Sequence, residues 1–336
     1  MIKTVNTNSI DPEKSELSAK IMIMASVFLF SCIPLGIALG NGDQAPFTHN
    51  AVAVFFARMG ILSYILIYYK NQLFDRGAWV VIFNNCKNMK FAAMIFGTLS
   101  FGFFNMSCQF INISVSAILF ETWTFWMIFI TYKIFKKDNI YNKINMSEWF
   151  WILMGFAGLA LVVFSQHEIS FLNAEISNIL IGITLASISA ASAAMLGSYS
   201  LMWGTSVARQ ITGKKSNDTN YVMFFVLWGL ILSSLPGITL GLLLGGFGPQ
   251  NEIVEVKNML VAAFTGFFII PMAQILYRKA NLMTVKLKIN ALYYLSPIVS
   301  VALLFAFGYV NADNLHLLFA GAFVTATSNI ILNYRK

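Results

Sequence analysis

The chain has 336 residues, of which 58% are hydrophobic and 11% are charged, and its mean hydropathy is +0.71. In soluble globular domains about a quarter of the residues are charged. The composition of this chain therefore excludes such a domain and indicates a protein embedded in the lipid bilayer. The net charge of +8 is spread over short loops, which argues against a nucleic-acid-binding surface, and no nucleic-acid partner is expected.

Apolar segments long enough to cross a bilayer follow one another along the chain, since a membrane-spanning helix needs about 20 residues. A polar tail, 1–18, precedes them, and the gap at about 70–90 contains an apolar run, Trp79 to Ile82, that fits a short interfacial helix. We therefore predict an all-α integral membrane protein with ten transmembrane helices. They cover 19–40, 49–70, 90–110, 113–134, 148–167, 175–203, 221–244, 258–277, 285–308 and 314–333.

Lysine and arginine fall almost entirely in every second gap between these segments, while the other gaps hold only Lys257. Cytoplasmic loops carry the excess of basic residues in membrane proteins, so both termini are predicted to be cytoplasmic. The expected location is the plasma membrane, which is the inner membrane in a bacterium. The basic gaps and ends contain Lys3, Lys14, Lys20, Lys70, Arg76, Lys87, Lys90, Lys133, Lys136, Lys137, Lys143, Arg209, Lys214, Lys215, Arg278, Lys279, Lys286, Lys288, Arg335 and Lys336.

The predicted helices divide into two sets of five, 19–170 and 171–336. An odd number of crossings per half gives the halves opposite orientations, the geometry of an inverted repeat with a site near the midplane between them. Weak self-similarity agrees with this division: the fourth segment reads AILFETW at 117–123 and the ninth reads ALYYLSP at 291–297.

Several segments resemble the EamA-like branch of the drug/metabolite transporter superfamily. They are FFARMG at 55–60, GFAGLALVVF at 155–164, ALYYLSPIVSVALLFAFG at 291–308 and GAFVTATSNIIL at 321–332. The resemblance implies a five-plus-five inverted repeat that transports small metabolites or drug-like compounds. It also implies a central cavity lined mainly by helices 1, 3, 4, 6, 8 and 9, which makes Ser31 of the first helix and Tyr294 of the ninth candidate site residues. The chain departs from the family pattern at Trp123, where the ninth helix has Pro297.

Glu121 is the acidic residue that lies well inside a predicted crossing, and an intramembrane carboxylate by default marks a functional site. Arg58 of the second helix lies at a similar depth, about 12–14 Å from the outer end at 1.5 Å per residue. Two interpretations follow and can coexist. The two side chains form an ion pair, or Glu121 binds substrate or a coupling proton.

On a helical wheel, Thr124 and Phe125 share the face of Glu121 and are candidate site residues with it. Trp123 lies about 200° away, so it would face a neighbouring helix or lipid if Glu121 faced the cavity. We expect packing to be its role.

Asn105 and Gln109 lie one turn apart on the third helix, and Gln274 and Tyr277 form their counterpart on the eighth. Such polar side chains either hydrogen-bond across to a neighbouring helix or line the cavity. On the second interpretation the first pair lies toward the outer mouth and the second pair toward the inner mouth.

Motifs of ATP hydrolysis and of hydrolytic or metal-dependent catalysis are missing, so no enzymatic activity, cofactor or metal site is expected. The expected function is secondary transport of a small organic metabolite or drug-like solute, with Glu121 as the residue that would couple it to protons. The alternative is a membrane receptor or scaffold that binds a ligand without moving it. The expected partners are the solute, the proton in the coupled case and the bilayer, and the chain is a monomer or a homodimer.

Overall fold

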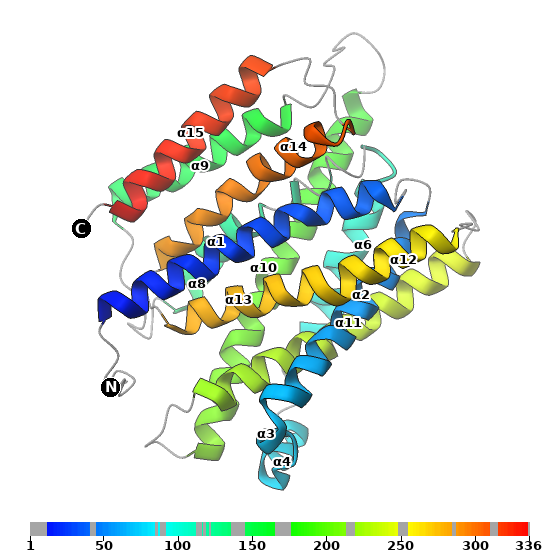
Figure 1. Ribbon diagram of the computed structural model, residues 1–336, viewed down its shortest axis with the longest axis vertical. Helices are drawn as coiled ribbons and strands as arrows, with labels where there is room; N and C mark the ends of the chain where they lie inside the picture. The colour runs from blue at the N-terminus through cyan, green and yellow to red at the C-terminus, as the bar shows by residue number, and fades with distance from the viewer. Residues whose placement is uncertain are drawn as a thin grey trace.

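Helices make up all the regular structure in the part of the chain that the computed structural model describes, and they pack side by side as a bundle (Figure 1). The described residues are 12–40, 45–84, 87, 92–111, 116, 119–120, 122–135, 145–164, 176–212, 219–247, 255–283, 287–309 and 315–334. The predicted all-α class is therefore confirmed.

The helices follow the predicted segments in order. The first half contains α1 (Pro12–Leu39), α2 (Pro46–Tyr68), α3 (Lys70–Leu73), α4 (Arg76–Asn84), the π-helical turn η1 (Ala93–Gly97) with α6 (Thr98–Ser107), α8 (Trp123–Phe135) and α9 (Met146–Phe164). The second half contains α10 (Ile176–Thr212), α11 (Thr219–Phe247), α12 (Val256–Phe264), the π-helical turn η3 (Thr265–Ile269), α13 (Ile270–Met283), the 3-10 helix η4 (Leu287–Leu295), α14 (Ser296–Ala306) and α15 (Leu315–Tyr334).

Five described helices are long and apolar enough to cross a membrane: Glu16–Leu39, Pro46–Tyr68, Ser177–Ala208, Asn220–Gly245 and Val256–Met283. Two shorter apolar helices cover Leu292–Ala306 and His316–Leu332. This set is compatible with a multi-pass membrane protein. The last of the long helices continues to Met283, past its predicted end at 277, so residues assigned to a loop from their charge are helical.

The eighth and ninth predicted segments, at 258–277 and 285–308, do not form uniform α-helices. Pro271 has no N–H to bond the carbonyl of Phe267, and the π turn η3 lies directly before it, where the chain must accommodate the lost bond. The predicted single helix at 285–308 is instead a 3-10 segment followed by α14, with Pro297 in the first turn of α14. Proline is well tolerated there because the first turn has no intrahelical acceptors for its N–H groups.

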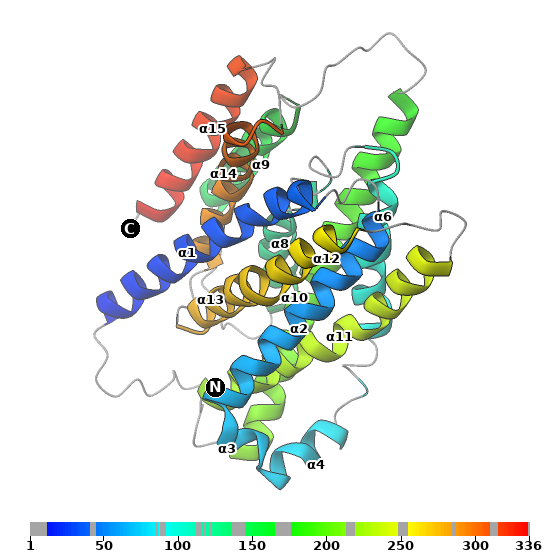
Figure 2. The ribbon, with the colours of Figure 1, turned by 45° about the vertical axis from the view of Figure 1, so that its right-hand side comes forward.

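Small residues allow α9 and α15 to pack along most of their length at one edge of the bundle (Figures 1 and 2). A Cβ at Gly158 would collide with the Thr325 side chain and with the backbone of α15. Ser328 donates a hydrogen bond to the carbonyl of Trp151, and Thr325 Oγ1 lies 3.5 Å from the carbonyl of Gly155. Close backbone approach with interhelical hydroxyl bonds is the usual way in which helices associate in lipid.

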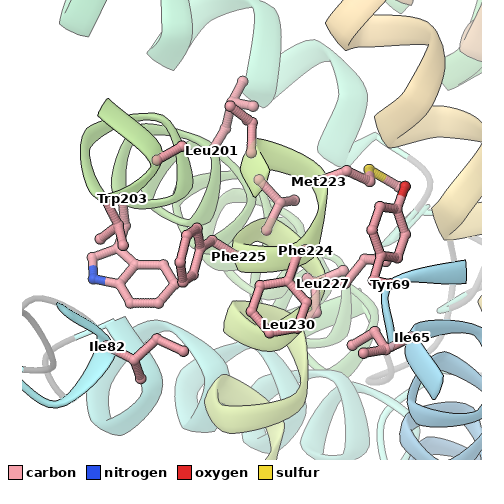
Figure 3. Packing of buried hydrophobic residues seen from close by; sticks show 14 of the residues in the cluster. Ile65, Tyr69, Ile82, Leu201, Trp203, Met223, Phe224, Phe225, Leu227 and Leu230 are labelled. Carbon is pink, nitrogen blue, oxygen red and sulfur yellow. The ribbon is translucent and has the colours of Figure 1, made fainter. Parts of the chain in front are cut away.

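An aromatic-rich core joins α2, α4, α10 and α11 at one end of the bundle (Figure 3). Phe224 and Phe225 of α11 are fully buried, and Trp203 of α10 packs edge-on against Phe225 at 5.8 Å. Ala78 and Ile82 bury one face of α4 in the same core. A short helix therefore does occupy the gap at 70–90, and its apolar side is held by the bundle.

Asp75 fixes the start of α4. Its Oδ1 accepts a hydrogen bond from the N–H of Gly77 at 2.8 Å, and its Oδ2 accepts one from the Tyr221 hydroxyl at 2.7 Å. The Tyr221 bond, helped by bonds from backbone N–H groups, outweighs the opposing effect of burial and lowers the pKa of Asp75 below its ordinary value of 3.8. A lowered pKa means that the carboxylate stabilises the folded state above that ordinary value, and that this contribution is lost as the pH falls through the folded pKa.

We expect Asp75→Ala to destabilise α4 by about 1 kcal/mol, as for other lost N-caps, which is about a fivefold faster opening of its amides. Hydrogen exchange of residues 76–84 measures this. Tyr221→Phe keeps the cap but removes one donor to the carboxylate, so its smaller destabilisation should be present above pH 4 and should fade as the pH falls and the Asp75 carboxyl protonates. Equal exchange in Asp75→Ala and the unchanged protein at neutral pH would refute the capping role.

Candidate functional site

A cavity of about 250 Å³ lies at the centre of the bundle, between helices from both halves of the chain. Most of its wall is apolar, with Phe30 and Ile33 of α1, Phe101 and Phe104 of α6, and Leu230 of α11 among the lining side chains. Residues of α2, η1, α8, α10, η3 and α13 complete the wall. A concave, mostly apolar space with a few convergent polar groups is the usual form of a small-molecule site.

Arg58 enters the cavity from α2 and is held by neutral partners. Its Nε donates to Ser234 Oγ of α11 at 2.8 Å, and its Nη1 donates to Gln274 Oε1 of α13 at 2.8 Å. Both acceptors also line the cavity. The bonds to α11 and α13 thereby fix the orientation of the guanidinium. No counter-charge accompanies it among the residues that the structure describes.

Arg278 supplies a second cation to the same wall, and it corrects the sequence-based assignment of this residue to a cytoplasmic loop. It is 7% exposed, since α13 continues for five residues beyond it. Its Nη1 donates to the carbonyl of Gly197 on α10 at 3.0 Å, and its guanidinium carbon lies 5.8 Å from the centre of the Tyr277 ring. The sequence did contain an indication that Arg278 faces the cavity: it lies one helical turn from Gln274, so the two residues share a face of the helix.

Arg58 and Arg278 both line this cavity, so two like charges face it from α2 and α13. The described residues that line the cavity include no aspartate or glutamate. Placing an arginine inside a membrane costs about 2.5–3.5 kcal/mol on insertion scales, and such residues normally mark a functional pathway. The polar side of this cavity is therefore cationic.

An aromatic cluster of Phe30, Trp123, Tyr277 and Tyr293 borders the cavity, and all but Tyr293 line its wall. Tyr277 meets Trp123 edge-on at 5.1 Å and Tyr293 edge-on at 4.9 Å, and Phe30 packs against Trp123 at 6.1 Å. The Tyr293 hydroxyl is hydrogen-bonded to Ser26 of α1. The four rings come from α1, α8, α13 and η4, so they join both halves of the chain. Trp123 lines the cavity, although its helical position had suggested a packing role away from it.

Both π-helical turns reach the cavity wall, through Gly97 at the end of η1 and Thr265 at the start of η3. Each also contains a glycine that lies against the backbone of a neighbouring helix: Gly97 against the carbonyl of Ser233, and Gly266 against the carbonyl of Ala53. Single π turns inside longer helices are frequent at functional sites.

Two of the predicted site residues, Glu121 and the side chain of Thr124, lie outside the described part of the chain. The predicted Arg58–Glu121 ion pair is therefore still a prediction. Because α8 begins at Trp123, its helical wheel cannot be carried back to Glu121.

The two predicted polar pairs have different positions in the structure. Gln274 and Tyr277 line the cavity, and Gln274 is the partner of Arg58. Asn105 is fully buried and accepts a hydrogen bond from Asn50 Nδ2 of α2 at 2.8 Å. Of the two predicted roles, it therefore has the first, a hydrogen bond to a neighbouring helix. Gln109 lies in the turn after α6, which ends at Ser107, and it is exposed.

Three further predicted residues lie in helix interfaces away from this wall. Ser31 Oγ donates to the carbonyls of Val27 and Ser296, at 2.7 and 3.0 Å, and so joins α1 to α14. Phe125 stacks on Phe156 of α9 at 4.6 Å. Tyr294 is fully buried in a cluster with residues of α8, α9 and α15. The family resemblance led us to expect the ninth predicted segment, which forms η4 and α14, to line the cavity. It contributes no described residue to the wall, whereas α2 and α11 do.

Comparison with known proteins gives a likeness of fold. No protein-family model matches the sequence, and no curated protein matches it. A solved crystal structure matches 94% of this chain and 95% of its own length, with a TM-score of 0.63 and 14% sequence identity. At that identity the likeness concerns the course of the chain through its helices.

Proposed function

We propose that the chain is a secondary transporter that moves a small organic solute across a membrane by alternating access. The observation that carries this proposal is the cavity that lies between helices from both halves of a highly apolar, multi-helix chain. Transporters built from two inverted halves bind their substrate at the interface of the halves, near the middle of the bilayer. The family that we propose is the EamA-like branch of the drug/metabolite transporters.

The pattern of helix contacts supports an inverted repeat of five helices. The first helix (α1) packs on the eighth (α12, η3 and α13) and on the ninth (η4 and α14), and the sixth (α10) packs on the third (η1 and α6) and on the fourth (α8). The second (α2) packs on the eighth, and the seventh (α11) on the third. Each of these named contacts becomes another when every helix is replaced by the one five places along, as a pseudo-twofold axis requires, whereas the contact of α10 with α11 has no comparable counterpart between α1 and α2.

The position of the cavity supports an outward-facing state, given the topology predicted from the basic residues. Its wall uses the later half of α1, from Phe30 to Ile37, and the earlier half of α2, from His49 to Arg58. These are the outer halves of both helices. Their inner halves are packed into hydrophobic clusters, with Ala19 and Ile23 among residues of α8, α10, α13 and η4. The aromatic cluster would then be the closed inner gate.

A counterflow assay tests the proposal. Purified protein in liposomes preloaded with unlabelled solute should accumulate the same labelled solute transiently, because the exchanging carrier must bind at each side in turn. The expected flux saturates with concentration. Binding without flux would favour the receptor or scaffold alternative, and flux without counterflow would show a channel.

Proton coupling through Glu121 predicts a specific pH response. Glu121→Gln should make uptake independent of an imposed pH gradient, since the only acidic residue well inside a predicted crossing can no longer titrate. Glu148→Gln is the matched control: Glu148 and Asn145 form a reciprocal cap at the start of α9, a role that glutamine also fills. An unchanged rate and pH profile in Glu121→Gln would make Glu121 structural.

A further inference from the structure

The described wall of the cavity is positively charged. Arg58 and Arg278 contribute two guanidinium groups to its wall, and the described lining residues contribute no carboxylate. Glu121 lies outside the described residues, and no other acidic residue lies well inside a predicted crossing. Among the described residues, the two cations of this wall are therefore opposed by no carboxylate.

The partners that the structure gives these arginines leave donors unused. A guanidinium has five N–H donors. Arg58 spends two of them on Ser234 and Gln274, and Arg278 spends one on the Gly197 carbonyl. All three acceptors are neutral, and the described residues provide no further acceptor to either side chain. Both side chains line the cavity, so the remaining donors are available to the acceptor atoms of a ligand.

From this geometry we propose that the transported solute is a small organic anion, whose carboxylate binds to Arg58 and Arg278 and whose apolar body lies against Phe101, Phe104 and Ile33. This rests on the proposed function and names its substrate class. A planar carboxylate matches the fork of an arginine, with two parallel hydrogen bonds. The apolar remainder of a cavity of about 250 Å³ suits a short branched or aromatic body.

The arrangement also explains why these cations are held so firmly. Ser234, Gln274 and Gly197 belong to α11, α13 and α10, so three helices orient the two guanidinium groups before any ligand arrives. Pre-oriented donors lose little entropy when they bind. A cationic solute would have to enter against two like charges.

Matched probes test the charge requirement on the purified full-length protein. Isovalerate and phenylacetate are compared with their uncharged amides, isovaleramide and phenylacetamide, and with isoamylamine and phenethylamine. We expect saturable thermal stabilisation by the carboxylates and at least a tenfold weaker effect of the amides and amines. Equal stabilisation by the amides, preference for the amines, or no response to any carboxylate overturns the proposal.

Variants assign the effect to the two arginines. Arg58→Gln and Arg278→Gln should each raise the half-saturating carboxylate concentration more than tenfold. Arg58→Lys keeps the charge but loses the fork, so it should give an intermediate increase. Arg76→Gln removes an exposed positive charge on α4 and should leave the response unchanged. If a glutamine variant fails to fold, the lysine variant and the probe series still decide.

The two proposals fail separately. Counterflow of an amine or a neutral solute, with no response to carboxylates, would leave the transporter standing and remove the anion assignment. Carboxylate binding that depends on both arginines, without counterflow, would leave the anion site standing and remove transport.

Discussion

Gly266→Val is expected to lower the apparent melting temperature of the protein by roughly 6–12 °C, from a loss of about 3 kcal/mol by overpacking. A Cβ at Gly266 would lie 2.9 Å from the carbonyl carbon of Ala53 and 3.0 Å from its Cα, so backbone atoms of α2 stand in its way. Flexible side chains can rotate away from an added methyl group, but helix backbones cannot. The valine would force α2 and η3 apart along the contact that forms one side of the cavity.

Gly60 provides a second test of this contact from the opposite helix. A Cβ there would meet the carbonyl of Phe267 and lie 2.6 Å from Pro271 Cγ, so Gly60→Val should be destabilising to a similar extent. Gly102→Val is the control, because a Cβ at Gly102 has no described atom within 4 Å. It should change stability by no more than about 0.5 kcal/mol. Similar melting temperatures for Gly266→Val and Gly102→Val would contradict the close approach of α2 and η3.

Tyr277→Ala should destabilise the protein by about 3–5 kcal/mol, as for other buried aromatic side chains, and abolish counterflow. The ring is 1% exposed and fills the space between Trp123 and Tyr293. Its removal leaves a void in the aromatic cluster beside the cavity, which is the inner gate of the proposed mechanism. Under the proposed mechanism, a gate that no longer closes lets the solute cross without exchange.

Tyr277→Phe separates the ring from its hydroxyl. The hydroxyl lies 3.4 Å from Met127 Sδ, a weak acceptor, so this variant should lose about 1 kcal/mol and retain counterflow. Tyr309→Ala removes an exposed aromatic ring near the end of α14 and should be close to neutral. Thermal unfolding in detergent and counterflow in liposomes measure the two effects. Retained counterflow in a folded Tyr277→Ala protein would show that the cluster does not gate the cavity.

The helical class and most of the helix positions follow from the sequence because the bilayer restricts the solutions. Backbone polar groups in lipid must be satisfied within the segment, so an apolar run of about 20 residues is expected to be helical. The π turn and the 3-10 segment depend on local conflicts, at Pro271 and before Pro297, and on the neighbouring helices that stabilise them. Hydropathy contains no information about either.

The site was harder to predict, and the arginines show why. Counting residues from the helix end gives the depth of Arg58 but not the neighbours that surround it, and its described partners, Ser234 and Gln274, are uncharged. Arg278 follows an apolar segment and precedes a lysine, the usual pattern of a cytoplasmic helix end. Its burial depends on the Gly197 carbonyl of α10, which is 81 residues away in the sequence.

The π turn at Thr265–Ile269 is a local defect between α12 and α13, because it contains one residue more than an α-helical turn. Such a defect can be displaced along the helix without unwinding it. Each residue that it passes is rotated by about 100° and shifted by about 1.5 Å. Displaced toward Met283 beyond Tyr277, it would turn Gln274 and Tyr277 away from the cavity together, breaking the Arg58–Gln274 bond and parting the aromatic rings in a single local step.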